Sequence, residues 1–169
     1  MFRQAAKVLG RFVRREVGSS MIEFAIVFPI LLLLFAGAAE IGRLLNTYTT
    51  LAKATDMGAR YLSTSRDATS TDSTLVNNAK LKAQRLVVCG YIDTCSGRTP
   101  LVPGLDVNNP ATNVLVTLPV STDTVKYVKV EIQNYSFPPG VFNLAGLTGQ
   151  ASSKYYFSLT PATKMRYMR

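Results

Sequence analysis

The longest apolar run of the chain covers residues 21–39, and Glu23 is its only ionisable residue. A helix of this length rises about 28 Å, at about 1.5 Å per residue, which is close to the thickness of a bilayer's hydrocarbon core. The alternative is a buried helix of a soluble protein, but a domain this small can hardly surround the run on all sides. The pattern therefore predicts a transmembrane helix over residues 19–40.

Beyond residue 40 the apolar positions recur at spacings of three and four, which is typical of one face of a helix. This spacing predicts an amphipathic helix over residues 41–66, continuous with the span. Such a stripe serves either as a stalk or as a cover for a sheet, and small residues on it permit close helix packing. The stripe consists of Ile41, Leu44, Leu45, Tyr48, Leu51, Thr55, Gly58, Tyr61 and Leu62, with Ala52, Ala54 and Ala59 as further small residues.

Residues 67–169 predict a small α+β domain. A polar link over 66–74 offers Asp72 or Ser73 as an N-cap for a second helix that ends near Cys89 and Gly90. Residues 96–110 are rich in Pro, Gly and Asn and predict a loop. Alternating apolar residues predict two strands, at 114–120 and 128–132, in a hairpin with its turn at 121–124. We further expect a short helical or irregular cover at 141–147 and strand-like segments at 153–160 and 164–167. The expected fold class is thus α+β, with a long N-terminal helix, a second helix and an antiparallel sheet of three or four strands.

The charge pattern predicts the orientation of the span. The formal net charge is +9, and the first eighteen residues hold five cations against one carboxylate. The positive-inside rule then keeps the N-terminus in the cytoplasm and exports everything after residue 40. A secretory signal peptide is the nearest alternative, but no convincing small-residue cleavage site ends the apolar run. The candidate cleavage point instead precedes the run, at Gly18.

The two cysteines, Cys89 and Cys95, are separated by five residues. Export would place them in an oxidising compartment, so we expect a disulfide that contributes about 2 kcal/mol by loop entropy. Two reduced, buried thiols are the alternative. A redox-active pair is not favoured, because such a pair usually has two intervening residues. The chain has no histidine, and two thiols alone make a poor zinc site, so we expect neither a metal nor another cofactor.

Two other function classes find weak support. The carboxylates of the exported part stand singly, without catalytic spacing, and no serine lies in a nucleophile motif, so we expect no enzyme activity. Cations interleaved with tyrosines could grip phosphates and stack bases, but such alternation is also typical of a solvated strand face, so nucleic-acid binding is not favoured. The cations concerned are Lys126, Lys129, Lys154, Lys164, Arg166 and Arg169.

The stretch Gly18-Ser19-Ser20-Met21-Ile22-Glu23-Phe24 resembles the processing site of type IV prepilins, in particular those of the tight-adherence (Tad) branch. The sequence that follows resembles the N-terminal domain of TadE-like minor pilins over some forty residues. The matching features are a proline in the apolar run, Glu-Ile-Gly-Arg after it and Gly-Ala-Arg-Tyr further on. The resemblance implies a leader, residues 1–18, cut between Gly18 and Ser19 by an inner-membrane prepilin peptidase. TadE-like proteins often carry an acidic residue near their end, whereas this chain ends in Met168 and Arg169.

A physical reading accompanies the resemblance. A carboxylate just inside the hydrocarbon costs about 2.5–3.5 kcal/mol on insertion scales, so it usually has a partner. Cleavage would create one, the new α-amino group of Ser19, one helical turn from Glu23 in the same or a neighbouring chain. The alternative is that Glu23 reaches the headgroups. Gly18 is expected to interrupt the helix and to suit a protease cleft, or to act as a hinge, while Pro29 is expected to kink or open the helix.

These observations lead to one expected function and one alternative. We expect a minor pilin or pseudopilin, anchored by one span in a bacterial inner membrane with its C-terminal domain in the periplasm, and later on the pilus or cell surface. The implied partners are the prepilin peptidase, other pilins of the same fibre through the N-terminal helix, and the inner-membrane assembly platform. Glu23, Phe24 and Pro29 would serve assembly. The alternative is an uncleaved, single-pass scaffold of such an assembly, TadF-like or similar.

Overall fold

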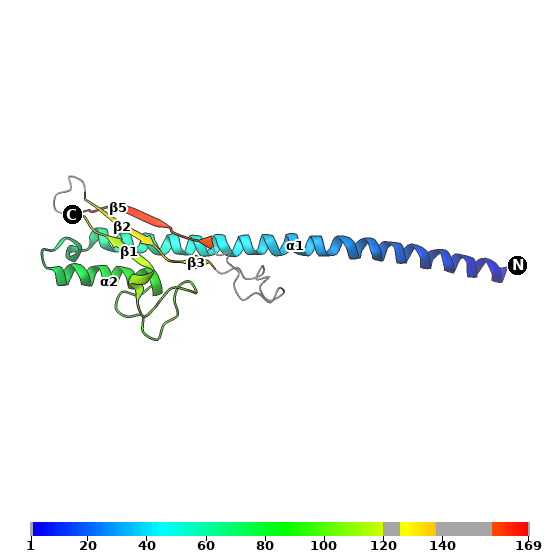
Figure 1. Ribbon diagram of the computed structural model, residues 1–169, viewed down its shortest axis with the longest axis horizontal. Coiled ribbons are helices and arrows are strands. Elements are labelled where there is room, and N and C mark those ends of the chain that lie inside the picture. The colour runs from blue at the N-terminus through cyan, green and yellow to red at the C-terminus, as the bar shows by residue number, and fades with distance from the viewer. Residues whose placement is uncertain (1, 120–125, 138–156, 169) are drawn as a thin grey trace. The chain divides into compact units, whose positions relative to one another are not determined.

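The computed structural model describes residues 2–119, 126–137 and 157–168, and the side chains from residue 20 onward (Figure 1). The chain divides into two compact units, Met1–Ile41 and Gly42–Arg169. All described residues of the first unit are helical and belong to α1 (Phe2–Thr64), which extends into the second unit. The prediction of an unbroken helix to about residue 65 is thus confirmed. The expectation that Gly18 interrupts the helix is wrong, because α1 continues through it.

The second unit begins with the C-terminal part of α1, followed by the 3-10 turn η1 (Arg66–Thr69) and the helix α2 (Ser73–Cys89). Asp72 caps α2 as expected, since its Oδ1 accepts a hydrogen bond from the Thr74 N–H at 2.8 Å. At the other end Gly90 adopts φ 77° and donates its N–H to the Leu86 carbonyl. This left-handed conformation is one that glycine adopts without steric cost, so the helix ends where the sequence predicted.

A three-stranded antiparallel sheet has the order β1-β2-β5, formed by β1 (Val114–Thr117), β2 (Tyr127–Ile132) and β5 (Ala162–Arg166). The register pairs Val116 with Val130 and Val130 with Thr163. A separate two-stranded pairing joins β3 (Ser136–Phe137) to β4 (Phe157–Ser158). The fold is therefore α+β with a small antiparallel sheet, as expected, and the third strand is the C-terminal one.

The core of the second unit is built from one face of each element. The predicted alternation in β2 is confirmed, because Val128, Val130 and Ile132 are fully buried while Tyr127 is exposed. In Figure 1, α2 and the sheet lie alongside the C-terminal part of α1. The buried residues of α1 and α2 include Leu51, Ala54, Ala59, Leu62, Ala79, Ala83, Val87 and Val88.

The helical stripe of α1 is buried only at its far end. From residue 51 on it packs into the core, whereas Ile41, Leu45 and Tyr48 remain 62%, 55% and 44% exposed. Between β1 and α2 the expected loop is present, with one short turn, η2 (Pro110–Thr112). The expected hairpin turn at 121–124, the cover at 141–147 and the first residues of the 153–160 segment lie outside the described residues.

Candidate functional site

The residues proposed for processing and assembly lie on the N-terminal part of α1. Gly18 and Ser19 are inside the helix, five and four residues before Glu23, respectively, on the same chain. A separation of four residues corresponds to about one helical turn, or about 6 Å along the axis. The structure thus places these two residues close together along one helix, and their roles in processing and assembly stay predictions.

The apolar part of α1 exposes nearly all of its side chains. Every residue from Ser20 to Phe35 is exposed, and the Phe35 side chain is 72% exposed. Soluble monomers rarely expose a contiguous apolar surface of this extent, so the segment requires a lipid or helix environment. From Ser20 onward α1 is long and apolar enough to cross a membrane. The span predicted from the sequence has the right length and surface for an anchor.

Phe24 and Pro29 have different surroundings within this span. The Phe24 and Phe28 rings are one turn apart, with their centroids at 5.3 Å, and form a tilted pair on one side of the helix. Pro29 lies inside α1, and the helix continues on both sides of it. Membrane helices tolerate such a proline because neighbouring groups satisfy the freed carbonyl.

The close approach of α1 to α2 depends on Gly58. A Cβ atom at this position would lie 2.7 Å from the Val87 Cγ2 and 3.5 Å from the Ala83 carbonyl oxygen. Real Cβ atoms do not come this near, so only glycine lets the two helices approach this closely. Gly58 is the first residue of the Gly-Ala-Arg-Tyr motif that supported the family resemblance. That motif therefore contains a residue that the fold requires.

Cys89 and Cys95 form a disulfide with a Cα–Cα distance of 5.9 Å, as predicted. The bridge ties the last residue of α2 to the loop that follows. The same loop is held by the Arg85 guanidinium, which donates to the Asp93 carbonyl, and by the Leu101 N–H, which donates to the Val88 carbonyl at 2.8 Å. The disulfide and these two hydrogen bonds therefore hold the loop against the end of α2.

The outer face of the sheet carries several of the cations considered for nucleic-acid binding. The Lys129 ammonium is bonded to the Glu131 carboxylate at 2.7 Å, and the Lys164 ammonium lies 4.3 Å from the centroid of the Tyr127 ring. Lys154 and Arg169 lie outside the described residues. Of the described cations, Lys129 and Lys164 therefore engage the sheet's own side chains, which is typical of a solvated strand face.

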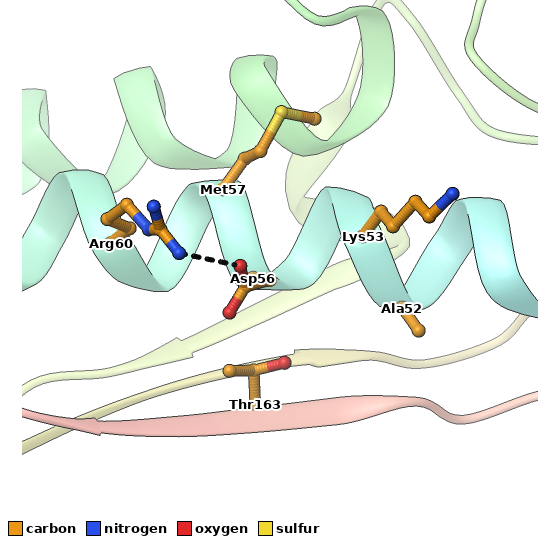
Figure 2. A pocket seen from close by; sticks show the side chains of 6 residues that line it. All are labelled: Ala52, Lys53, Asp56, Met57, Arg60 and Thr163. Atoms are coloured by element: carbon orange, nitrogen blue, oxygen red, sulfur yellow. Dashed lines mark hydrogen bonds and ion pairs between the residues drawn. The ribbon is translucent and has the colours of Figure 1, made fainter.

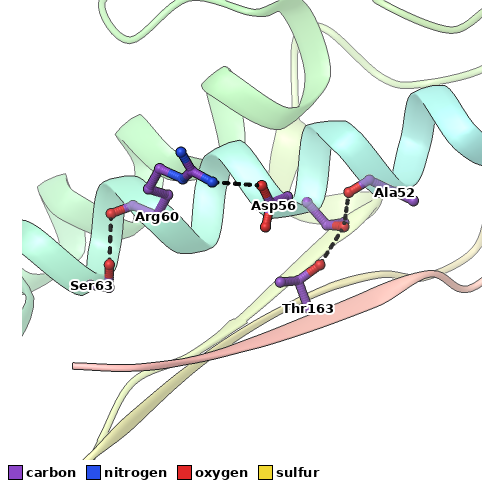
Figure 3. A network of polar contacts seen from close by, with 6 residues as sticks. Ala52, Asp56, Arg60, Ser63 and Thr163 are labelled. Carbon is purple, nitrogen blue, oxygen red and sulfur yellow. Dashed lines mark hydrogen bonds and ion pairs between the residues drawn. The ribbon is translucent and has the colours of Figure 1, made fainter. Parts of the chain in front are cut away.

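A shallow hollow of about 550 Å³ lies between α1 and β5 (Figure 2). Its lining comes from α1 except for Thr163, which projects from β5 toward the helix. Across this junction the Thr163 hydroxyl and the buried Thr55 hydroxyl are 3.0 Å apart (Figure 3), and Asp56 and Arg60 form an exposed pair at 3.4 Å. Sequence reasoning did not find this hollow, because the two elements are more than a hundred residues apart. Its lining residues are Ala52, Lys53, Asp56, Met57, Arg60 and Thr163.

One tyrosine of the second unit has a perturbed pKa. Burial raises the pKa of Tyr135 above its ordinary value of 10.0, and the nearby Arg43 guanidinium opposes the shift. The Tyr135 hydroxyl donates to the Pro103 carbonyl at 3.2 Å. This group holds a loop in place, and no cluster of three or more metal-ligating side chains occurs among the described residues.

The comparisons with known proteins bear on the N-terminal segment. The family model of TadE-like proteins matches residues 18–60. No curated protein matches the chain, and no solved structure matches it either. The match begins at Gly18 and ends at Arg60, so it includes the span, the proposed site and Gly58. The resemblance inferred from the sequence is thereby confirmed for residues 18–60, and this TadE-like segment suggests a protein associated with Tad pili.

Proposed function

We propose that this protein is a minor pilin or pseudopilin of a Tad-type pilus, made as a membrane-anchored precursor and processed after Gly18. The observation that carries the proposal is the TadE-like match, which begins at Gly18 itself and continues through an exposed apolar helix. In this function the apolar surface of α1 first spans the inner membrane and later packs against neighbouring helices in the fibre. The second unit would remain outside the membrane, and the protein would act in assembly, initiation or at the tip, and thereby in surface adhesion.

The proposal assigns no catalysis and no cofactor to the chain. Without histidine, acid-base chemistry would depend on carboxylates. Of the described carboxylates in the second unit, Asp56 and Glu131 form ion pairs, and Asp72 and Asp106 accept backbone N–H groups. Each of these four carboxylates therefore has a structural role.

Processing is tested by mass spectrometry of the protein isolated from cells with and without active prepilin peptidase. We expect a mature chain that begins at Ser19 in the first case and at the original N-terminus in the second. Because α1 continues through Gly18, the peptidase must open the helix locally before cleavage. This continuity is the observation that favours the alternative function, an uncleaved single-pass scaffold. Retention of residues 1–18 in wild-type cells would establish that alternative.

The role of Glu23 is tested by substitution. Glu23→Ala should leave cleavage largely intact but impair pilus assembly, because the amino group of Ser19 would lose its partner carboxylate. Glu23→Gln is the matched control for size and polarity, and it should impair assembly to a similar degree if the charge is what matters. Normal piliation in both variants would refute an ion pair between Glu23 and the new N-terminus.

A further inference from the structure

The three-stranded sheet has two edges, and the helix α2 bonds to the edge formed by β1. The Gln133 N–H donates to the Asn113 carbonyl at 2.8 Å, which fixes the alternation of the β1–β2 ladder. Val114 and Val116 therefore direct their backbone groups away from β2. The Val114 carbonyl accepts a hydrogen bond from Gln84 Nε2 of α2 at 2.9 Å. The helix thus bonds to an outward-pointing carbonyl of this edge.

The edge formed by β5 is different. The Ile132 N–H donates to the Pro161 carbonyl at 3.0 Å, and the Tyr167 N–H donates to the Lys126 carbonyl at 2.9 Å. By the same alternation, the odd-numbered residues of β5 bond to β2, and the even-numbered residues point their backbone groups outward. Among the described residues no strand pairs with this edge, and just beyond β5 the Met168 N–H, on the same side, donates to the Ser63 carbonyl of α1 at 3.1 Å. The outward-pointing residues are Ala162, Lys164 and Arg166.

The hollow of Figure 2 lies beside this edge. Thr163 faces the hollow from the edge strand, and its hydroxyl contact with Thr55 holds β5 against α1 (Figure 3). An open edge offers main-chain hydrogen bonds, and an adjacent hollow receives alternate side chains of an added strand, which are the two requirements for peptide binding by strand addition. Ala52 and Met57 provide the apolar part of its lining.

The charges around the edge determine what kind of strand fits. Lys164 and Arg166 stand on the outer face of β5, and directly across from Lys164 the neighbouring strand also carries a lysine, Lys129. The Lys129 charge is compensated by Glu131 at 2.7 Å. On the hollow side, Lys53 and Arg60 outnumber Asp56. A strand with carboxylates therefore complements both faces of the edge.

A second copy of this chain fits poorly. Antiparallel self-pairing over all five residues of β5 would place Lys164 opposite Lys164, and like charges at directly opposite positions are destabilising. Cationic residues on edge strands are a common device against such self-pairing. The same cations favour an acidic partner.

We propose that the open edge of β5 binds an extended acidic segment of another protein by β-strand addition. In the complex, two carboxylates of the added strand stand opposite Lys164 and Arg166, and the intervening side chains lie in the hollow over α1. The inference goes beyond the proposed function and does not rest on it, because it uses only the geometry of the second unit.

The first test measures binding of a fluorescent peptide in which Glu and Val alternate to the full-length protein in detergent micelles. Lys164→Glu should weaken this binding roughly tenfold and create affinity for the matching Lys–Val peptide, because attraction across the strand pair becomes repulsion. Lys80→Glu, a cation on α2 outside the hollow, is the matched control and should leave the affinity unchanged. Absence of binding of the Glu–Val peptide overturns the proposal.

The second test separates strand addition from simple charge attraction. Ala162→Pro removes an outward N–H but no charge, and it leaves the ladder to β2 intact because proline is tolerated where the N–H faces outward. It should abolish peptide binding while the thermal unfolding temperature stays unchanged. Unchanged binding in this variant, together with competition by an oligonucleotide, would show a polyanion surface instead and overturn the proposal.

The third test follows amide hydrogen exchange by NMR with isotopically labelled lysine. The Lys164 amide should exchange fast in the free protein and slowly with the Glu–Val peptide. The Lys129 amide, which takes part in the β1–β2 ladder, is the internal control and should be slow in both. Slow exchange at Lys164 without peptide would show that the edge is already covered. Self-association that Lys164→Glu abolishes would identify a second copy as the occupant. Either result overturns the proposal.

Discussion

Two stretches of α1 show how one helix can be built for two environments. Residues 20–35 are mostly large and apolar, and all of them are exposed. Residues 51–63 bury both large and small side chains, and Leu51 and Ala59 are fully buried where Phe35 is 72% exposed. The first stretch has the surface of a helix that contacts lipid or other helices, and the second stretch fits against α2 and the sheet. Apolar character alone therefore does not distinguish the two, whereas the charged residues do, since residues 51–63 carry Lys53 and Arg60 on their exposed side.

Within the buried stretch, the largest loss of stability is expected when Gly58 is replaced by a larger residue. Gly58→Val should destabilise the second unit by about 3 kcal/mol, because its Cβ would lie 2.7 Å from the Val87 Cγ2. Gly42→Ala is the matched control on the same helix, since a Cβ there meets no atom within 4 Å and alanine favours helix by about 1 kcal/mol. Thermal unfolding of the full-length protein in micelles measures both. Equal unfolding temperatures for the two variants would contradict the tight packing assigned to the buried stretch.

Removal of the disulfide should have the next largest effect. Changing Cys89 and Cys95 together to Ser should destabilise the second unit by about 2 kcal/mol, because the closed loop is short. The helical signal of the exposed stretch of α1 should not change. Circular dichroism during chemical unfolding reports both quantities, and wild-type protein with reductant is the control. A variant as stable as the wild type would mean that the other contacts of this loop suffice to hold it.

A smaller effect is expected where α1 meets β5. Thr163→Val should cost about 1 kcal/mol, because it removes the hydroxyl that faces the buried Thr55 hydroxyl at 3.0 Å. Changing both threonines to Val also removes the bond that the Thr55 hydroxyl donates to the Ala52 carbonyl at 2.8 Å, and it should cost less than the sum of the two single changes. A double-mutant cycle from unfolding curves gives the coupling. Thr50→Val, whose hydroxyl bonds only within the exposed part of the helix, is the control. Strictly additive effects at Thr55 and Thr163 would refute the coupling.

The smallest effect concerns pH. The pKa of Tyr135 is raised in the folded state from 10.0, chiefly by burial. A raised folded pKa means that this contribution to stability is fully present below the unfolded pKa, and that it is lost as the pH rises from about 10 through the folded value. The unfolding temperature should therefore fall above pH about 10. Tyr135→Phe should fall less steeply over that range, and an identical decline would assign the pH dependence to other groups.

Much of the fold could be predicted because the signals for it are local. The N-cap at Asp72, the C-cap at Gly90 and the alternation in β2 each depend on neighbours within a few residues, and all three were found in the structure. The interruption expected at Gly18 was wrong. A single glycine costs a helix only about 1 kcal/mol relative to alanine, which helix-forming residues on both sides can offset.

The candidate site also has a part that could be predicted from local sequence and a part that could not. The motif around Gly18 and Glu23 could be found because it is a continuous stretch, and the family match covers it. The hollow beside β5 and the open strand edge could not be found, because they depend on which strand pairs with which. An alternating segment such as β5 carries no information about the strand it will join.

By itself, the sequence determined the long helix, its apolar span, the second helix with its caps and the pair of cysteines. These features depend on hydrophobic period, on residue size and on groups that lie close together along the chain. Only the tertiary structure decided that Gly58 faces Val87 and that Thr55 meets Thr163 across 108 residues. It also decided that α2 bonds to one sheet edge, while no strand among the described residues pairs with the other. The physical reason is that these contacts join distant segments, and their partners are selected by shape and by backbone hydrogen bonding once the chain has folded.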